Sequence, residues 1–357
     1  MPLETAHLRV VQGEARGLLA AAARAALRAG VPLYRAGAAL DARRKLARRA
    51  SPGRPTVSVG NLAAGGTGKT PAVIWVVGRL REAGHRPAVL TRGHGGRAGA
   101  EADEVLVLRE ALGPEVPVTP DPDRHAAAAA TLAAHPRTSC FVLDDGFQRR
   151  DVARDLDLVL VDASRGLAAA RVLPAGLLRE PPGALARADA VLLTRVERAG
   201  PGRAAEVGAW VRRHHGRAPL ASFAHRWSGL DAFAPGAVEP EGRPLAALRG
   251  RRVYAAAGVG HPAAFAEQLR EAGAEVVGEA ALGDHHRPGD AGLRALHAAA
   301  EAAGAEAVAT TQKDRVKWRE LEAGPAALPL WVPRLWFEAV SGEAALTRLL
   351  LARVGPV

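Results

Sequence analysis

Cysteine is almost absent from this chain, with only Cys140 in 357 residues. A single cysteine excludes a disulfide framework and any zinc site built from cysteines. Because Cys140 stands inside the apolar run Cys140–Leu143, we expect a small buried side chain. Aromatic residues are also scarce at 4% of the sequence. This leaves few platforms on which nucleic-acid bases could stack, and no nucleic-acid-binding motif is recognisable.

Long apolar runs are missing as well. No stretch approaches the roughly 18 apolar residues that a membrane-spanning helix needs. The N-terminal residues also lack the charged-then-apolar order of a secretory signal peptide. We therefore expect a cytoplasmic protein.

Charge of one sign dominates, with 48 Lys and Arg against 37 Asp and Glu, a formal net charge of +11. A basic surface attracts nucleic acid, anionic membranes or phosphorylated substrates. A compositional bias toward arginine would produce the same sign of charge. Net charge alone therefore selects none of these partners.

The most informative stretch runs from Val57 to Thr70 and contains Gly-Gly-Thr-Gly-Lys-Thr. An apolar strand enters a glycine-rich turn and leaves into a helix, which is the layout of a phosphate-binding P-loop. Lys69 would reach the β- and γ-phosphates of a nucleotide, and the Thr70 hydroxyl would hold Mg²⁺. Ala63 stands where the standard pattern has its first glycine, so an ordinary strand-to-helix turn is the competing interpretation. The residues expected around the phosphates, at the positive end of the helix, are Gly65, Gly66, Thr67, Gly68, Lys69 and Thr70.

An acidic pair, Asp144-Asp145, ends the apolar run 140–143. A carboxylate at the tip of a buried strand, downstream of a P-loop, is typical of a Mg²⁺ ligand in nucleotide-binding proteins. Asp-Gly also favours turns, so a turn or helix cap is the alternative. Two adjacent acids favour the metal role.

Several other polar groups are ambiguous on their own. The stretch 91–97 has the glycines and arginines of a loop over phosphates or sugar hydroxyls, or of a plain exposed loop. The pairs Asp103-Glu104 and Asp123-Arg124 read as ordinary solvated residues. The stretch 284–286 (Asp-His-His) could supply an acid or base, although an exposed histidine pair is commoner.

The order of elements predicts an α/β fold. Alternating short apolar runs and helical stretches indicate a sheet with helices on both faces. We expect strands at 56–59, 87–90, 105–108, 139–143, 158–161, 190–193, 253–257, 274–277 and 307–310. We expect helices at 71–83, 124–134, 200–214, 262–272 and 291–303, and a last helix from residue 343.

This pattern divides the chain into three parts. Residues 1–50 read as a basic helical segment, which could lie on an anionic membrane surface or be a solvated helix packed on the core. Residues 51–220 form a P-loop NTPase-like α/β/α sandwich domain. Residues 221–357 form a second, smaller α/β domain, whose C-terminal tail could pack back on the first.

Taken together, the motifs resemble those of the tetraacyldisaccharide 4′-kinase family of lipid A biosynthesis. The resemblance covers roughly residues 30 to 320, in the order of the family. It departs from the usual pattern at His94, Ala102, Val105 and Arg149. The matching stretches are Val57–Pro71, Arg92–Gly96, Asp103-Glu104, Asp123-Arg124, Asp144–Gln148 (DDGFQ), Leu173–Pro181 (LPAGLLREP), Asp284-His285 and Thr311–Asp314.

The resemblance implies a kinase that moves the γ-phosphate of ATP to the 4′-hydroxyl of a tetraacylated glucosamine disaccharide 1-phosphate. It implies Asp103 as the base on the sugar hydroxyl, with His285 orienting it, and Lys69 on the nucleotide phosphates. It further implies peripheral association with the cytoplasmic face of the inner membrane, and we expect no nucleic-acid or protein partner. The implied metal-site residues are Thr70, Asp144, Asp145, Glu104 and Glu180; the implied phosphate or substrate contacts are Arg124, Gln148 and Arg179.

Two other functions remain open from the residues. A P-loop GTPase or metallochaperone-like switch protein would carry a guanine-reading element, which the stretch 311–314 (Thr-Gln-Lys-Asp) resembles superficially from the second domain. A basic nucleic-acid-binding protein would show steep salt dependence on DNA and no nucleotide turnover.

Overall fold

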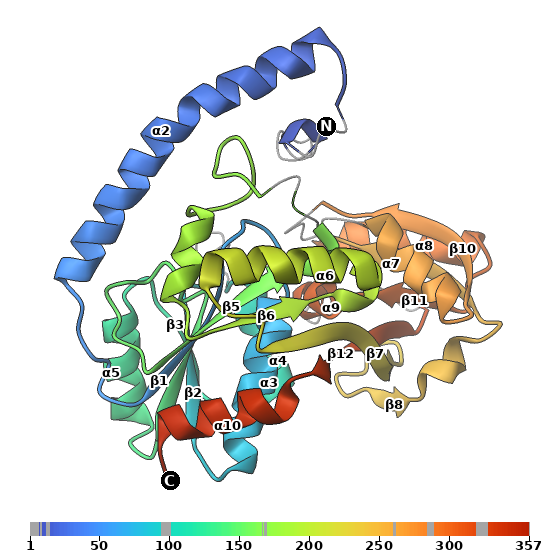
Figure 1. Cartoon of the computed structure of the whole chain (residues 1–357). Helices are drawn as coiled ribbons and strands as arrows, with labels where there is room; N and C mark the ends of the chain where they lie inside the picture. Colours follow the sequence, from blue (N-terminus) through green and yellow to red (C-terminus); the bar gives the residue numbers. More distant parts are fainter. Residues whose placement is uncertain are drawn as a thin grey trace. The chain divides into compact units, whose positions relative to one another are not determined.

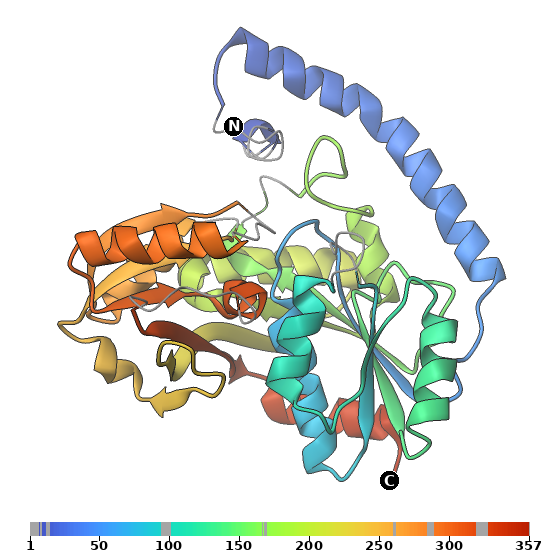
Figure 2. The same ribbon diagram turned by 180° about the vertical axis from the view of Figure 1, so that it is seen from behind.

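The computed structural model describes residues 7, 9–11, 15–93, 101–165, 167, 170–259, 262–283, 289–318 and 328–356 (Figures 1 and 2). The chain divides into two compact units. Unit 1 contains Met1–Arg92, Leu112–His225 and Phe337–Val357, and unit 2 contains Gly93–Ala111 and Arg226–Trp336. The C-terminal segment therefore belongs to the same unit as the P-loop.

Unit 1 is built on a parallel sheet whose strands follow the order β7-β6-β5-β1-β4-β2-β3. The central strand β1 lies between two strands that come much later in the chain, and its Val57 is in register with Val142 and Leu156. The carboxyl ends of β4 and β5 therefore flank the turn that follows β1. The bounds are β1 Thr56–Asn61, β2 Pro87–Thr91, β3 Val118–Pro120, β4 Cys140–Asp144, β5 Leu156–Asp162, β6 Ala190–Thr194 and β7 Ala221–Phe233.

Helices cover both faces of this sheet. One face carries two apolar clusters: α5 packs on Phe141 and Leu143, and α6 packs on Val159 and Val191. Because alternate residues of a strand point to opposite faces, these clusters leave the other face to α3 and α10. Those two helices pack against each other and against β1 (Figure 1). The bounds are α3 Lys69–Glu82, α5 Arg124–Ala134, α6 Val196–His215 and α10 Glu343–Val354.

The N-terminal helix α2 (Leu18–Ala47) is the longest in the described part of the chain and buries only Ala20. Its Tyr34 hydroxyl donates to the Arg179 carbonyl at 3.1 Å, which ties the helix to the loop before the short helix η2 (Pro182–Arg187). Large apolar side chains on α2 face solvent, with Leu33 81% exposed. None of the helices in the described residues is both long enough and apolar enough to cross a bilayer.

Unit 2 repeats the layered plan on a smaller scale. Strands β10, β9, β11 and β12 run parallel in that order, and β8 pairs antiparallel with the second half of β7. Helix α7 packs on the face of β9 that carries Val253 and Ala255, and α8 packs on the face that carries Ala256. The bounds are α4 Asp103–Leu112, β8 Glu241–Arg243, β9 Arg252–Ala257, α7 Pro262–Glu271, β10 Glu275–Ala281, α8 Gly289–Ala302, β11 Ala307–Thr310, α9 Gln312–Trp318 and β12 Leu330–Ser341.

The predicted α/β class and P-loop NTPase-like architecture are confirmed. The strand expected at 105–108 is wrong, because these residues lie inside helix α4. Val105, Leu108 and Leu112 are buried at helical spacing, and Asp103 and Glu104 occupy the first turn, where acidic side chains stabilise a helix. The sequence-based prediction also missed α9, β3, β8 and β12.

Candidate active site

The P-loop follows β1 and turns into α3 as predicted. Gly68 precedes the first helical residue with a left-handed backbone (φ 88°), and Lys69 and Thr70 begin α3. A Cβ atom on Gly60 would approach the Phe147 backbone nitrogen to 2.6 Å. The tight approach of backbone at this point therefore requires glycine.

Side chains from neighbouring strands hold the loop in shape. Asn61 donates to the Thr67 hydroxyl at 2.7 Å, and Thr194 donates to the Thr67 carbonyl at 2.9 Å. Arg165 and Arg195 both donate to the Gly66 carbonyl, at 3.0 and 2.7 Å. These hydrogen bonds hold the carbonyl oxygens of Gly66 and Thr67 against neighbouring side chains. The backbone N–H groups of the loop are then left to bind an anion.

The two guanidinium groups at the loop share one acid. Asp162, at the end of β5, contacts Arg195 at 2.5 Å and Arg165 at 3.2 Å. The Asp162 side chain is only 2% exposed, so this pairing is shielded from solvent. Asp162 therefore anchors both arginines that support the loop.

Asp144 and Asp145 follow β4 and behave differently despite being neighbours. Asp144 is buried, and its Oδ2 accepts from the Thr91 hydroxyl at 3.0 Å. Asp145 has a left-handed backbone (φ 55°), so its carboxylate leaves the strand direction. It lies 3.5 Å from the Lys69 ammonium and accepts from Arg179 at 2.9 and 2.8 Å.

The pKa values of the two acids are shifted in opposite directions. Burial, followed by the charge of Asp145, raises the pKa of Asp144. Burial also acts to raise the pKa of Asp145, but Lys69 and Arg179 outweigh it and the net pKa is lowered. The lowered pKa favours the ionised form of Asp145, while the Asp144 carboxylate would be stabilised by a bound cation.

Gln148 and Arg179 complete this group. Arg179 donates to the Gln148 side-chain oxygen at 3.2 Å, and the Gln148 amide donates to the Asn61 carbonyl at 3.0 Å. The DDGFQ stretch, the LPAGLLREP stretch and the P-loop are thus joined by one set of hydrogen bonds. Of the predicted residues, the structure brings together Lys69, Asp145, Gln148 and Arg179.

Arg124 is the first residue of α5 and is 1% exposed. It donates to the Asp121 carbonyl, and burial lowers its pKa to about 10, against the opposing pull of Asp144 and Asp145. A buried guanidinium within the field of two carboxylates suits an anionic ligand in their neighbourhood.

Unit 2 holds a second polar group around Asp103, which is 5% exposed. The Lys317 ammonium is fully buried and lies 2.7 Å from Asp314 and 3.9 Å from Asp103. Asp314 also accepts from the Gly258 backbone N–H at 2.8 Å, which ties the group to the end of β9. Glu104 lies 3.8 Å from Lys313.

Glu180, His285 and the glycine-rich loop were also predicted to belong to the active site. Glu180 pairs with Arg150 and Arg187, each at 3.0 Å, rather than with the acids of the P-loop group. His285 lies outside the described residues, as do residues 94–100 of the glycine-rich loop. Their predicted roles stay predictions.

The surroundings of Asp144 fit a metal ion. The Asp144 Oδ1 atom is buried and has no hydrogen-bond partner in the described part of the chain. An orphaned carboxylate oxygen beside a second acid suits a hard cation such as Mg²⁺. Among the described residues there is no group of three or more acidic, histidine or cysteine side chains that would hold a metal by itself. A Mg²⁺ ion here would therefore depend on nucleotide phosphates or water for further ligands.

Some supporting residues were not predicted. Asn61 and Thr91 end β1 and β2, inside the stretches 57–70 and 91–97 that the sequence singled out, but neither was given a role of its own. Lys317 lies three residues after Asp314, a helical spacing that gives a signal only once α9 is recognised. Arg165 and Arg195 lie in unremarkable connections and carry no sequence signal.

A glycine-rich loop, its lysine and a pair of strand-end carboxylates at the carboxyl edge of a parallel sheet define a P-loop nucleotide-binding protein. The sequence profile described as tetraacyldisaccharide-1-P 4′-kinase matches residues 25–355. The chain belongs to this family.

Similar proteins agree with this assignment. A tetraacyldisaccharide 4′-kinase of Anaeromyxobacter sp. (strain Fw109-5) is 42% identical over 338 residues, which cover 89% of this chain and 88% of the relative. One from Geobacter metallireducens is 40% identical and covers 74% of this chain and 78% of the relative. The structure of LpxK from Aquifex aeolicus in complex with ATP has a TM-score of 0.67 at 24% identity, over 93% of this chain and 99% of that chain. At 24% identity, this structural similarity is evidence for the fold alone.

Proposed function

We propose that this protein transfers the γ-phosphate of ATP to the 4′-hydroxyl of a tetraacyldisaccharide 1-phosphate, a step of lipid A biosynthesis. The observation that carries the proposal is the contact of Lys69 with Asp145 and of Asp145 with Arg179, which joins three family motifs at the P-loop. The family assignment supports a kinase over the GTPase alternative.

Phosphoryl transfer asks the protein for positioning and charge neutralisation more than for covalent chemistry. Lys69 and the loop N–H groups would bind the β- and γ-phosphates, with Arg124, Gln148 and Arg179 as further contacts to phosphate or acceptor. Asp144 and Thr70 would hold Mg²⁺, which neutralises phosphate charge when bound. Asp145 would keep Lys69 and Arg179 in place. Glu104 and Glu180 are proposed to support the metal site indirectly.

Asp103 is proposed as the base that accepts the proton of the sugar hydroxyl, with His285 orienting it. Asp103 is buried and lies 3.9 Å from the buried Lys317 side chain, which holds the carboxylate in one place, as a base that must meet the hydroxyl proton requires. In Asp103→Asn, turnover should fall by about 10²- to 10⁴-fold, the usual contribution of a general base, while ATP affinity stays within about twofold. Near-normal turnover in this variant would remove Asp103 from the mechanism.

The deciding experiment measures labelled phosphate transfer from ATP to the purified acceptor in detergent micelles with Mg²⁺. Lys69→Ala should abolish transfer, because it removes the cation that faces the phosphates. Arg213→Ala, an exposed change on α6, is the control that should leave transfer intact. Nucleotide hydrolysis without acceptor, or a preference for GTP, would contradict the kinase.

Helix α2 is proposed to lie on the anionic cytoplasmic face of the inner membrane. It exposes Leu33 and Leu40 among many arginines, a composition that suits an interfacial helix. Leu33→Asp should weaken flotation with vesicles containing anionic phospholipid. Equal flotation of this variant would show that α2 does not insert there.

A further inference from the structure

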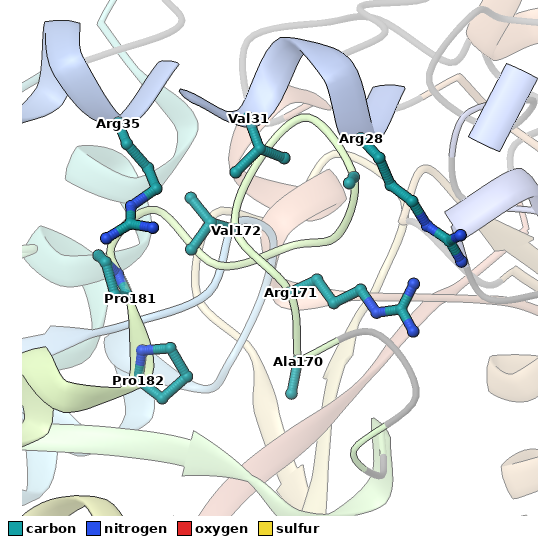
Figure 3. Close-up of a pocket in the computed structure, with 9 residues that line it drawn as sticks. Arg28, Val31, Arg35, Ala170, Arg171, Val172, Pro181 and Pro182 are labelled. Carbon is teal, nitrogen blue, oxygen red and sulfur yellow. The ribbon is translucent and has the colours of Figure 1, made fainter. Parts of the chain in front are cut away.

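A hollow of about 580 Å³ opens between α2 and the loop 170–182, both in unit 1. Its wall is mainly apolar, formed by Val31 of α2, by Val172 and Ala170 of the loop, and by two prolines (Figure 3). Three arginines, Arg28, Arg35 and Arg171, stand around it. The hollow is separate from the contacts of Lys69 and the acidic pair described above.

In the described part of the chain, the three arginines have no acidic partners. None of them makes an ion pair within the described residues, whereas most arginines of the neighbouring P-loop group do. Two acids near these arginines in the sequence are already paired, Asp41 with Lys45 and Glu180 with Arg150 and Arg187. Like charges gathered around an apolar surface repel one another, and a bound anion would relieve that repulsion.

Figure 3 shows how the charges are distributed. Arg28 and Arg171 extend at one end of the hollow, and Arg35 lies at the other end beside Pro181, with Val31 and Val172 between them. Charged ends and an apolar middle match an amphiphile, which offers both a phosphate and hydrocarbon.

The walls of the hollow are fixed. The Tyr34 hydroxyl bonds to the Arg179 carbonyl, and within the loop Leu173 donates to the Leu178 carbonyl at 2.9 Å. Gly30 allows α2 to approach Pro174, since a Cβ there would lie 3.2 Å from the ring. These contacts hold α2 and the loop together beside the hollow.

We infer that this hollow is a binding site for one anionic glycerophospholipid, whose phosphate contacts Arg28, Arg35 or Arg171 and whose first acyl carbons lie on Val31 and Val172. The choice of phospholipid rests on the proposed membrane contact of α2, because phospholipid phosphate is the most abundant anion at a bilayer surface. Such a site would bind α2 and the loop to one specific lipid molecule. This binding would add to the general electrostatic attraction between the basic helix and an anionic membrane.

The test measures binding of a short-chain phosphatidylglycerol, below its micelle concentration, to the full chain. The matching phosphatidylcholine, which carries no net charge, is the paired probe. Arg171→Gln and Arg28→Gln should each weaken phosphatidylglycerol binding about tenfold, which corresponds to about 1.4 kcal/mol for a lost charge-assisted hydrogen bond. Arg43→Gln removes an exposed arginine of α2 that does not line the hollow, so it should leave binding unchanged.

Several results would overturn the inference: equal losses in Arg43→Gln and Arg28→Gln, equal binding of both lipids, or displacement of phosphatidylglycerol by the tetraacyldisaccharide acceptor. The last would assign the hollow to the acceptor. Val31→Asp should abolish binding of the soluble lipid, while Leu33→Asp should affect vesicle flotation alone. Lys69→Ala should lose phosphate transfer and keep lipid binding, so the kinase and the lipid site can fail separately.

Discussion

Burial beside the P-loop controls the protonation state of one side chain, His225. His225 packs against Gly68, and burial lowers its pKa to about 3. The ring nitrogen Nε2 is buried without a hydrogen-bond partner in the described residues. The neutral ring is therefore part of the folded state.

This histidine makes stability depend on pH. Its ordinary pKa is near 6.5, so between pH 6.5 and 3 the unfolded chain binds a proton that the folded chain does not. Stability contributed by the neutral ring is complete above pH 6.5 and decreases as the pH falls, by up to about 1.4 kcal/mol per pH unit. The loss of unfolding free energy between pH 7 and 5 should be smaller in His225→Leu by roughly 2 kcal/mol.

Urea unfolding at the two pH values measures this difference. His135→Gln, a change at an exposed histidine, is the control and should retain the full loss. An unchanged pH dependence in His225→Leu would assign the acid sensitivity to other groups.

Sequence reading worked best for residues whose role depends on near neighbours. Lys69, Asp144 and Asp145 were predicted because each directly follows a strand or glycine turn within the same short motif. Gln148 and Arg179 entered only through the family resemblance, since their hydrogen bonds span 31 residues. Lys317 was missed because its contact with Asp103 joins positions more than 200 residues apart, and only the folded chain brings them together.

Among the elements, the P-loop turn gives a sharp contrast between two glycines. Gly68 has φ 88°, and a Cβ there would lie 2.6 Å from the His225 ring. Gly66 has no positive φ, and its Cβ would meet only the far end of Arg195 at 3.9 Å. The two positions differ in strain although both belong to the same motif.

Gly68→Ala should therefore lower the free energy of unfolding by about 1–2 kcal/mol from the left-handed backbone alone, with the steric clash adding to this. Gly66→Ala should stay within about 0.5 kcal/mol. Thermal or urea unfolding of the pair measures the contrast. Equal destabilisation would mean that the turn tolerates a side chain at both positions.

Element boundaries were predictable where the periodicity was clear and failed where it was ambiguous. The helix 124–134 and the strand 307–310 have the predicted bounds. The residues 105–108 alternate Val and Leu, a run that fits a buried strand or a helix, and the acids before it were the overlooked helix signal. Strand β12 lies in the stretch that was predicted only as a C-terminal tail, and it contains Pro333, a residue type that usually argues against a strand interior.

At the scale of the molecule, unit 1 is assembled from three separate chain segments. The last of them carries α10, whose Leu346 and Leu350 are fully buried. This helix packs on α3, the helix that begins with the P-loop lysine. The C-terminal residues thus support the nucleotide-binding loop through the helix behind it.

Leu350→Ala should lower the unfolding free energy of unit 1 by roughly 2–5 kcal/mol, through lost burial and the cavity left behind. Chemical denaturation measures the loss of stability, and an ATP-binding assay on the same variant measures whether the P-loop behind α3 is affected. Arg348→Ala, exposed on the same helix, should change stability by less than about 0.5 kcal/mol. A small effect of Leu350→Ala would mean that the helix can close over the gap.

The place of α10 in the chain also has a consequence for synthesis. Residues 226–336, which form unit 2 together with residues 93–111, are synthesised before the segment that finishes unit 1. The P-loop is made early, whereas α10, the helix that packs on α3, is made only after residues 226–336. A nascent chain that stalls before residue 343 therefore exposes apolar surface of α3, and we expect it to be a substrate for chaperones and proteases until α10 has been made.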